Sequence, residues 1–166
     1  ISSISLIDLD VTQLQTPYFE YDIIFQMSSK SFNRVITDLC LMDCEEVRFI
    51  VTHEGDVYIE SGNDSLKSKI LLNNKKEEEE KDEEKEEEEE EKDEEHTNQF
   101  KLIKYDKETD ISVSYCLNYI KSFSKTMQLS NKVTISLSRE YPMFIQYIFD
   151  NDRGQATYYL TPKIEE

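Results

Sequence analysis

The 166-residue sequence contains little glycine and proline and has no long apolar run. Its three glycines are Gly55, Gly62 and Gly154, so it lacks a glycine-rich loop of the kind that holds phosphate groups. No apolar stretch reaches the roughly 18 residues that a bilayer-spanning helix needs, and no basic-then-apolar leader opens the chain. We therefore expect a soluble protein with no membrane partner. The chain starts at Ile1 rather than methionine, which indicates a fragment of a longer protein.

Histidine and cysteine are also scarce. Cys40, Cys44 and Cys116 form no Cys-x-x-Cys pair, and only His53 and His96 could join them, which argues against a structural zinc site. We expect reduced, buried thiols, as in a nuclear or cytosolic protein. Neither histidine lies in a motif with a nucleophile, and there is no Gly-x-Ser-x-Gly elbow. The sequence therefore predicts no enzyme, no catalytic residue, no metal and no cofactor.

Acidic residues are in large excess, at 36 against 19 basic residues, for a net charge of −17. Between Lys75 and His96 the chain holds 16 acidic and 5 basic residues, so this tract alone contributes −11. The tract has no apolar side chains to bury before His96, and its like charges repel one another. We therefore predict a disordered acidic insertion over 75–98. By itself, the tract allows an acidic, histone-chaperone-like function in which it binds basic proteins by charge.

The remaining sequence alternates between strand and helix patterns. After a predicted strand at 20–27, a helix from Ser28 or Ser29 to about Asp43 would bury the apolar stripe Phe32, Val35, Ile36 and Leu39. A second amphipathic helix is predicted from Leu117 to about Leu129. Strands are predicted at 46–52, 56–61, 66–72, 100–105, 111–115, 132–138, 142–149 and 155–161.

This order predicts an α+β fold built from a duplicated βαβββ unit. The connections between strands have the length of hairpin turns, so the sheets should be antiparallel. Both helices should pack on the same side of the sheets, because each has one apolar face to bury.

Four separated segments resemble one known family. They read SLIDLDVTQL at 5–14, SFNRVITDL at 31–39, LNYIKSFSK at 117–125 and YYLTPKIE at 158–165. They are similar to the interdomain connector, the two helices of the second domain and the C-terminal tail of the proliferating cell nuclear antigen (PCNA) family of sliding DNA clamps. The resemblance implies a connector with the end of a preceding strand at 1–19 and a C-terminal clamp domain at 20–166.

The resemblance implies a DNA polymerase processivity factor in the nucleus, a ring of three subunits whose helices face duplex DNA. Lys30 and Arg34 are four residues apart, as are Lys121 and Lys125, and both pairs lie off the apolar stripes. Without the resemblance, such pairs are more simply explained as solvated helix faces. With it, they predict sequence-independent contacts to DNA phosphates.

The resemblance also implies a pocket under the connector that docks short peptides of DNA polymerase, flap nuclease, ligase and clamp loader. Thr16 stands where the family usually has an aliphatic residue and Thr161 where it usually has alanine, which implies a smaller or wetter pocket. The prolines, taken alone, could instead only protect sheet edges. The matching positions are Leu14, Thr16, Pro142, Tyr159, Thr161 and Pro162.

A strand at 65–72 matches the edge that pairs with a neighbouring subunit, so the full-length protein should be a homotrimer. The first domain of the family is absent here, so we expect that this chain alone closes no normal ring. A checkpoint-type heterotrimer is the alternative, against which the Tyr159 and Pro162 tail argues. His53 occupies the turn where many eukaryotic clamps carry a lysine that accepts ubiquitin. The predicted interface residues are Ser65, Leu66, Lys67, Ser68, Lys69, Ile70, Leu71 and Leu72.

Overall fold

The computed structural model describes residues 19–42, 44–62, 67–74, 99–105, 110–149 and 154–163. The acidic tract, Leu14, Thr16, Ser65 and Leu66 lie outside the described residues. The described elements are β1 (Ile23–Ser28), α1 (Ser29–Cys40), β2 (Glu46–Val51), β3 (Val57–Gly62), β4 (Lys67–Asn74), β5 (Gln99–Tyr105), β6 (Ile111–Cys116), α2 (Leu117–Ser124), the 3-10 helix η1 (Lys125–Gln128), β7 (Lys132–Leu137), β8 (Met143–Ile148) and β9 (Gln155–Leu160).

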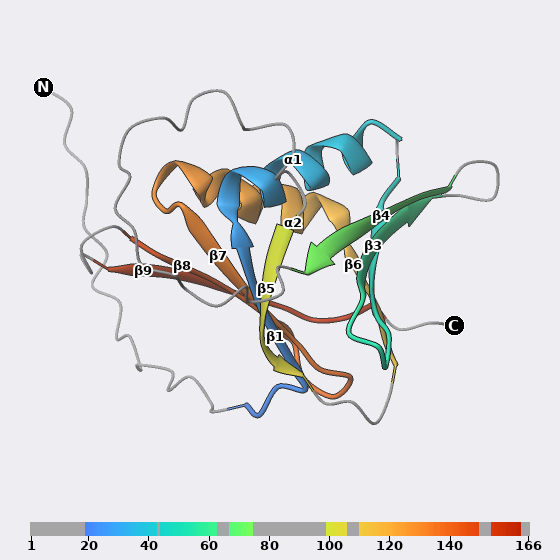
Figure 1. The fold of residues 1–166 in the computed structure, drawn as a ribbon. Coiled ribbons are helices and arrows are strands. Elements are labelled where there is room, and N and C mark those ends of the chain that lie inside the picture. The colour runs from blue at the N-terminus through green and yellow to red at the C-terminus, as the bar shows by residue number, and fades with distance from the viewer. Residues whose placement is uncertain are drawn as a thin grey trace, which may run out of the picture.

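The strands form two antiparallel sheets that join edge to edge in the order β6-β2-β3-β4-β5-β1-β7-β8-β9. The join between β4 and β5 is parallel and covers only two residue pairs, Asn73 with Gln99 and Asn74 with Phe100. Figure 1 shows α1 and α2 together on one side of the strands. The predicted α+β fold with antiparallel sheets and both helices on one side is confirmed.

The two βαβββ repeats of the sequence do not correspond to the two sheets of the structure. Strand β1 of the first βαβββ unit pairs with β7 of the second unit, and β6 of the second unit pairs with β2 of the first. Each helix therefore connects one sheet to the other. Strand β5 belongs to neither repeat and pairs with β1. The units exchange their first strands, which places the two helices side by side over the junction of the sheets.

Helix α1 begins where predicted, because the Ser28 hydroxyl accepts a hydrogen bond from the Ser31 amide at 3.5 Å. Its predicted stripe is buried, as is Ser29, whose hydroxyl donates to the carbonyl of Ser130. The helix ends at Cys40, earlier than the expected Asp43, and the next residue, Leu41, is exposed. The second helix keeps α-helical geometry only to Ser124, and its last turn is the 3-10 helix η1.

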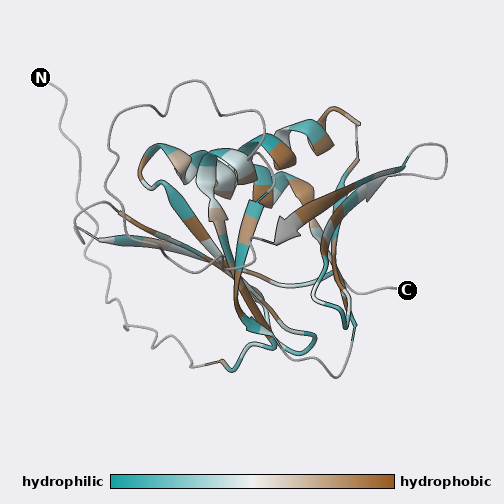
Figure 2. Cartoon of the chain, viewed as in Figure 1, coloured by the Kyte–Doolittle hydropathy of each residue, from teal (hydrophilic) through white to brown (hydrophobic). Residues whose placement is uncertain are grey.

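The core lies between the helices and the inner faces of the sheets and includes Phe25, Phe49, Tyr115 and Tyr147. Figure 2 shows hydrophobic and hydrophilic residues alternating around both helices and along the strands, which is typical of elements with one buried face. None of the described helices is long and apolar enough to cross a membrane.

The expectation of buried cysteines is wrong, although all three are free thiols. Cys40, Cys44 and Cys116 are each partly exposed, because they lie at element ends, beyond the buried stripe of α1 and beside the first turn of α2. Burial still raises the pKa of the Cys40 thiol, and the nearby Lys121 ammonium offsets part of that rise.

Several strand boundaries also differ from expectation, by one to three residues. Strand β1 begins at Ile23 rather than Glu20, and the ring of Tyr21 instead packs against Phe144, with 6.1 Å between ring centroids. Strand β9 ends at Leu160, before Pro162, which has no amide proton to continue a ladder.

Candidate DNA interface and peptide pocket

Four cations lie on α1, α2 and η1, and we call them the basic helix face. Within the described residues none of its members makes an ion pair, and all are exposed. Asp38 is the only carboxylate in α1, and α2 and η1 contain none. The basic helix face consists of Lys30, Arg34, Lys121 and Lys125.

One hydrogen bond joins the two helices, and another fixes the start of α1. The Ser124 hydroxyl of α2 donates to the side-chain carbonyl of Asn33 in α1 at 2.9 Å and also contacts the carbonyl of Lys121. The Ser29 amide donates to the carbonyl of Asn131 at 3.0 Å, which fixes the start of α1. The helices that carry the cations are therefore joined to each other and to the segment before β7.

A second surface lies at the end of β8 and β9. Their ladder ends where Met143 pairs with Leu160, so Pro142 and Thr161 follow at the same end of the two strands. Tyr159, 41% exposed, lies across the ladder from Phe144, and their ring centroids are 5.1 Å apart. Three of the predicted pocket positions, Pro142, Tyr159 and Thr161, are thus brought together.

The fourth described position, Pro162, is half-buried where the tail crosses to the other sheet. The next residue, Lys163, donates its amide to the carbonyl of Ser114 at 2.8 Å, and its ammonium lies 3.1 Å from a carboxylate oxygen of Glu46. A hydrogen bond from Ser114, together with the Lys163 ammonium, holds the pKa of Glu46 below its usual range. The tail is therefore pinned against β6 and β2.

Aromatic residues that the sequence reasoning missed extend this surface. The Phe19 ring lies 4.9 Å from that of Tyr141 and 6.4 Å from that of Tyr159, and Phe144 packs on Tyr159 and Tyr21. Burial raises the pKa of Tyr21 to about 12, and the Tyr159 hydroxyl adds to the rise. The alternation of β8 could have identified Phe144, since it shares a face with Tyr159. The aromatic cluster consists of Phe19, Tyr21, Tyr141, Phe144 and Tyr159.

The predicted interface strand has one free edge over most of its length. Its residues Lys67 to Leu72 pair with β3, whereas β5 reaches only Asn73 and Asn74. Among the described strands none covers the other side of 67–72. The backbone groups on that side are available to a further strand.

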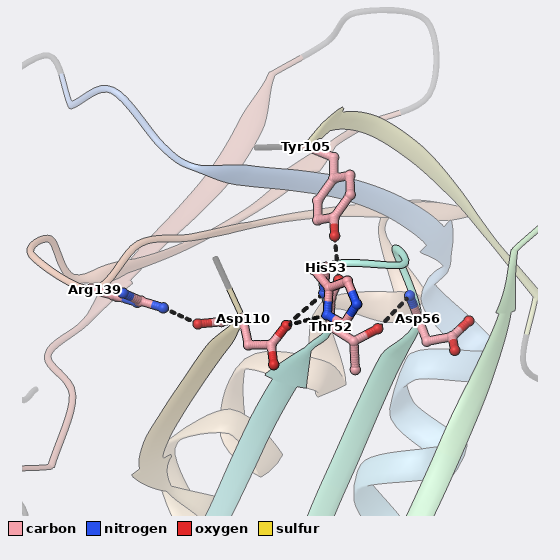
Figure 3. Close-up of polar contacts among 6 residues, drawn as sticks. All are labelled: Thr52, His53, Asp56, Tyr105, Asp110 and Arg139. Carbon is pink, nitrogen blue, oxygen red and sulfur yellow. Dashed lines mark hydrogen bonds and ion pairs between the residues drawn. The ribbon is translucent and has the colours of Figure 1, made fainter. Parts of the chain in front are cut away.

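The turn between β2 and β3 is held by a network of polar contacts (Figure 3). A carboxylate oxygen of Asp110 accepts a hydrogen bond from the His53 amide at 2.6 Å and lies 3.1 Å from its imidazole Nδ1. These two contacts are the main reason that the pKa of Asp110 lies below its ordinary value. Arg139 donates to the carbonyl of Asp110, and the Tyr105 hydroxyl donates to that of Thr52. The turn is thus tied to Asp110 and to Tyr105 of β5, and its exposed side chain is the His53 imidazole.

Within the ranges the structure describes, no three His, Cys, Asp or Glu side chains lie close enough together to hold a metal ion. Comparison with protein-family models gives one match over residues 15–163, to the family described as "Proliferating cell nuclear antigen, C-terminal domain". The match spans both helices, both sheets and the pinned tail.

Proposed function

Because this chain belongs to the PCNA family of sliding clamps, which are scaffolds without enzymatic activity, we propose that it is part of a DNA polymerase processivity factor that encircles duplex DNA. The observation that carries the proposal is the basic helix face. A protein of net charge −17 has four exposed cations on α1, α2 and η1 that make no ion pair with any described residue. Lysine and arginine on a smooth helical surface attract phosphates of any sequence, which suits sliding.

The aromatic cluster supports a peptide-docking role in the same protein. Rigid aromatic and proline side chains bind apolar plugs with little loss of conformational entropy. The cluster includes Tyr159 and lies at the end of the β8–β9 ladder, where Pro142 and Thr161 follow. We expect it to dock clamp-binding peptides of DNA polymerase, flap nuclease, ligase and clamp loader, with Leu14 and Thr16 completing the wall.

The free edge of β4 supports assembly by sheet continuation between subunits. In the full-length protein this edge would pair with the last strand of a neighbour's first domain and give a homotrimer. We propose further that this trimer forms a ring and acts in the nucleus. The mass of the full-length subunit, purified without partners, separates this homotrimer from a heterotrimer of the checkpoint type.

The docking role is tested by titrating a fluorescent clamp-binding peptide into the 166-residue chain. We expect saturable binding that Tyr159→Ala weakens by about 2 kcal/mol, roughly 30-fold, because the substitution removes an aromatic wall. Tyr119→Ala is the matched control, since Tyr119 is also an exposed tyrosine but lies on α2. No binding at high micromolar peptide, or equal losses in the two variants, would contradict the docking role.

The acidic tract favours a second candidate, binding of basic proteins such as histones by charge. Pull-down of histones by the chain, lost on deletion of 75–98 and unchanged by Tyr159→Ala, would favour that candidate. Retention of peptide binding after the deletion would instead favour the clamp.

A further inference from the structure

We propose that the acidic segment 75–98 docks on the basic helix face of its own domain and competes there with duplex DNA. The competition with DNA rests on the proposed function, whereas the intramolecular contact does not. Three observations on the described residues support the proposal. They are the place where the segment is attached, the cations that have no carboxylate partner among the described residues, and the distance that the segment can span.

Both ends of the segment are attached at one place, close to the start of α1. The segment leaves β4 after Asn74 and enters β5 at Gln99, and these strand ends pair with each other. Phe100 pairs in turn with Met27, two residues before α1. A cavity of about 380 Å³ is lined by residues from β1, the start of β5, Asn131 and the first residue of β7, Lys132. Figure 1 shows the end of β4 and the start of β5 beneath the helices.

The charges of the two surfaces are complementary. The segment carries 16 acidic and 5 basic residues. Several cations elsewhere already have carboxylate partners, as in the pairs Lys104 with Glu20 and Lys163 with Glu46. The basic helix face and the neighbouring Lys132 have none among the described residues. The largest excess of negative charge in the sequence is thus tethered beside cations that the rest of the fold leaves unneutralised.

The segment is long enough to cover the face. It has 24 residues, so a loop with both ends at one place extends roughly 40 Å from its attachment at full stretch. Helix α1 has 12 residues and is therefore only about 18 Å long. Tethering also keeps the segment at an effective concentration on the order of millimolar near the face, so that weak contacts suffice.

The predicted consequence is a DNA interface that is partly neutralised before DNA arrives. Duplex phosphates must displace glutamates as well as counterions, so the segment should reduce the affinity for short duplexes most at low salt, where the segment itself binds best. Added salt screens the tethered contact over a Debye length of about 10 Å at 0.1 M, so the effect of the segment should fade as salt rises.

The intramolecular contact is tested by comparing the 166-residue chain with a variant in which 75–98 is replaced by a Gly/Ser linker of equal length. We expect backbone amide chemical shifts of α1 and α2 around the basic helix face to differ between the two proteins at low salt. The differences should vanish at about 0.5 M salt. They should not change on dilution.

The matched control replaces Lys30, Arg34, Lys121 and Lys125 by glutamine in both proteins, which should abolish the shift differences. Differences confined to residues next to Asn74 and Gln99 would overturn the proposal. Differences that disappear on dilution would also overturn it, since the occupant would then be the segment of a second copy. When residues 75–98 are added as a separate peptide, the amide chemical shifts of the linker variant should move toward those of the unaltered chain. The result then does not depend on the linker substitution alone.

A second measurement separates this proposal from the proposed function. A 20-base-pair duplex should bind the linker variant on the order of tenfold more tightly than the unaltered chain at about 50 mM salt, because a tethered competitor has been removed. If neither protein binds DNA while the shift differences persist, the proposed DNA contact of the basic helix face fails and the intramolecular contact stands. If both bind DNA equally and no helix shifts differ, the contact fails and the clamp function stands.

Discussion

Tyr115 and Tyr147 bury their side chains completely, yet neither hydroxyl finds a hydrogen-bond partner among the described residues. Burial raises the pKa of both phenols, and of Tyr21 to about 12. A buried, unpartnered hydroxyl loses its hydration on folding and gains nothing in return, so these phenols contribute through their rings alone.

The first prediction is that Tyr147→Phe leaves the free energy of unfolding at pH 7 within about 1 kcal/mol of the parent value, or raises it. In the unfolded chain a tyrosine ionises near pH 10, whereas the folded protein keeps the buried phenols neutral. Stability should therefore be complete below about pH 10 and fall as pH rises toward 12, the pKa of Tyr21.

Urea unfolding followed by circular dichroism from pH 7 to pH 11 measures this effect. Tyr147→Phe should lose less stability at alkaline pH than the parent, while Tyr159→Phe, which alters a half-exposed ring, should follow the parent. A large loss at pH 7 in Tyr147→Phe would mean that the hydroxyl has a partner.

Single residues also show which parts of the candidate sites could be predicted from the sequence. Tyr159 and Pro162 were found because the tail resembles a family, and Lys30 and Arg34 because their spacing places them on one helix face. Phe19 was missed, since its contacts with Tyr141 and Tyr159 come from parts of the chain more than 100 residues away. Such contacts depend on the sheet register, which no local pattern encodes.

At the scale of elements, local patterns predicted both helices and every described strand, because each has one apolar face at the period of its element. They did not predict that β1 and β6 change places between the two sheets, or that η1 is a 3-10 helix. Pairing between distant strands is decided by how whole faces pack, and the tight last turn follows from local contacts such as that of the Ser124 hydroxyl with the Lys121 carbonyl.

The second prediction concerns the junction of α1 and α2. Ser124→Ala removes the hydroxyl that donates to Asn33 and should lower the free energy of unfolding by about 1–3 kcal/mol, because Ser124 is fully buried and the Asn33 oxygen would lose its donor. Ser122→Ala is the matched control, since its exposed hydroxyl contacts only the carbonyl of Asn118 in its own helix. Thermal or urea unfolding measures both, and equal effects would show that the α1–α2 bond adds no stability.

At the scale of the whole molecule, negative charge dominates the sequence, while four exposed cations lie on α1, α2 and η1, where Asp38 is the only carboxylate. Net charge governs long-range steering, whereas short-range attraction depends on the local surface within about one Debye length. An acidic protein can therefore bind an acidic polymer, provided that its cations are gathered where the polymer lies and its own acidic segment is displaced.

The third prediction tests whether the position of a cation, rather than the net charge, determines the affinity for DNA. In the chain carrying the Gly/Ser linker, Lys121→Gln should weaken duplex binding to a similar degree for every DNA sequence and reduce the slope of log K against log salt by about 1, because one phosphate contact is lost. Lys67→Gln is the control, since it removes the same charge from β4, away from the basic helix face. Fluorescence anisotropy over a salt series distinguishes the two variants. Equal slopes for them would mean that net charge, rather than the position of Lys121 on the helices, sets the affinity for DNA, and the helices would then not be the DNA-facing surface.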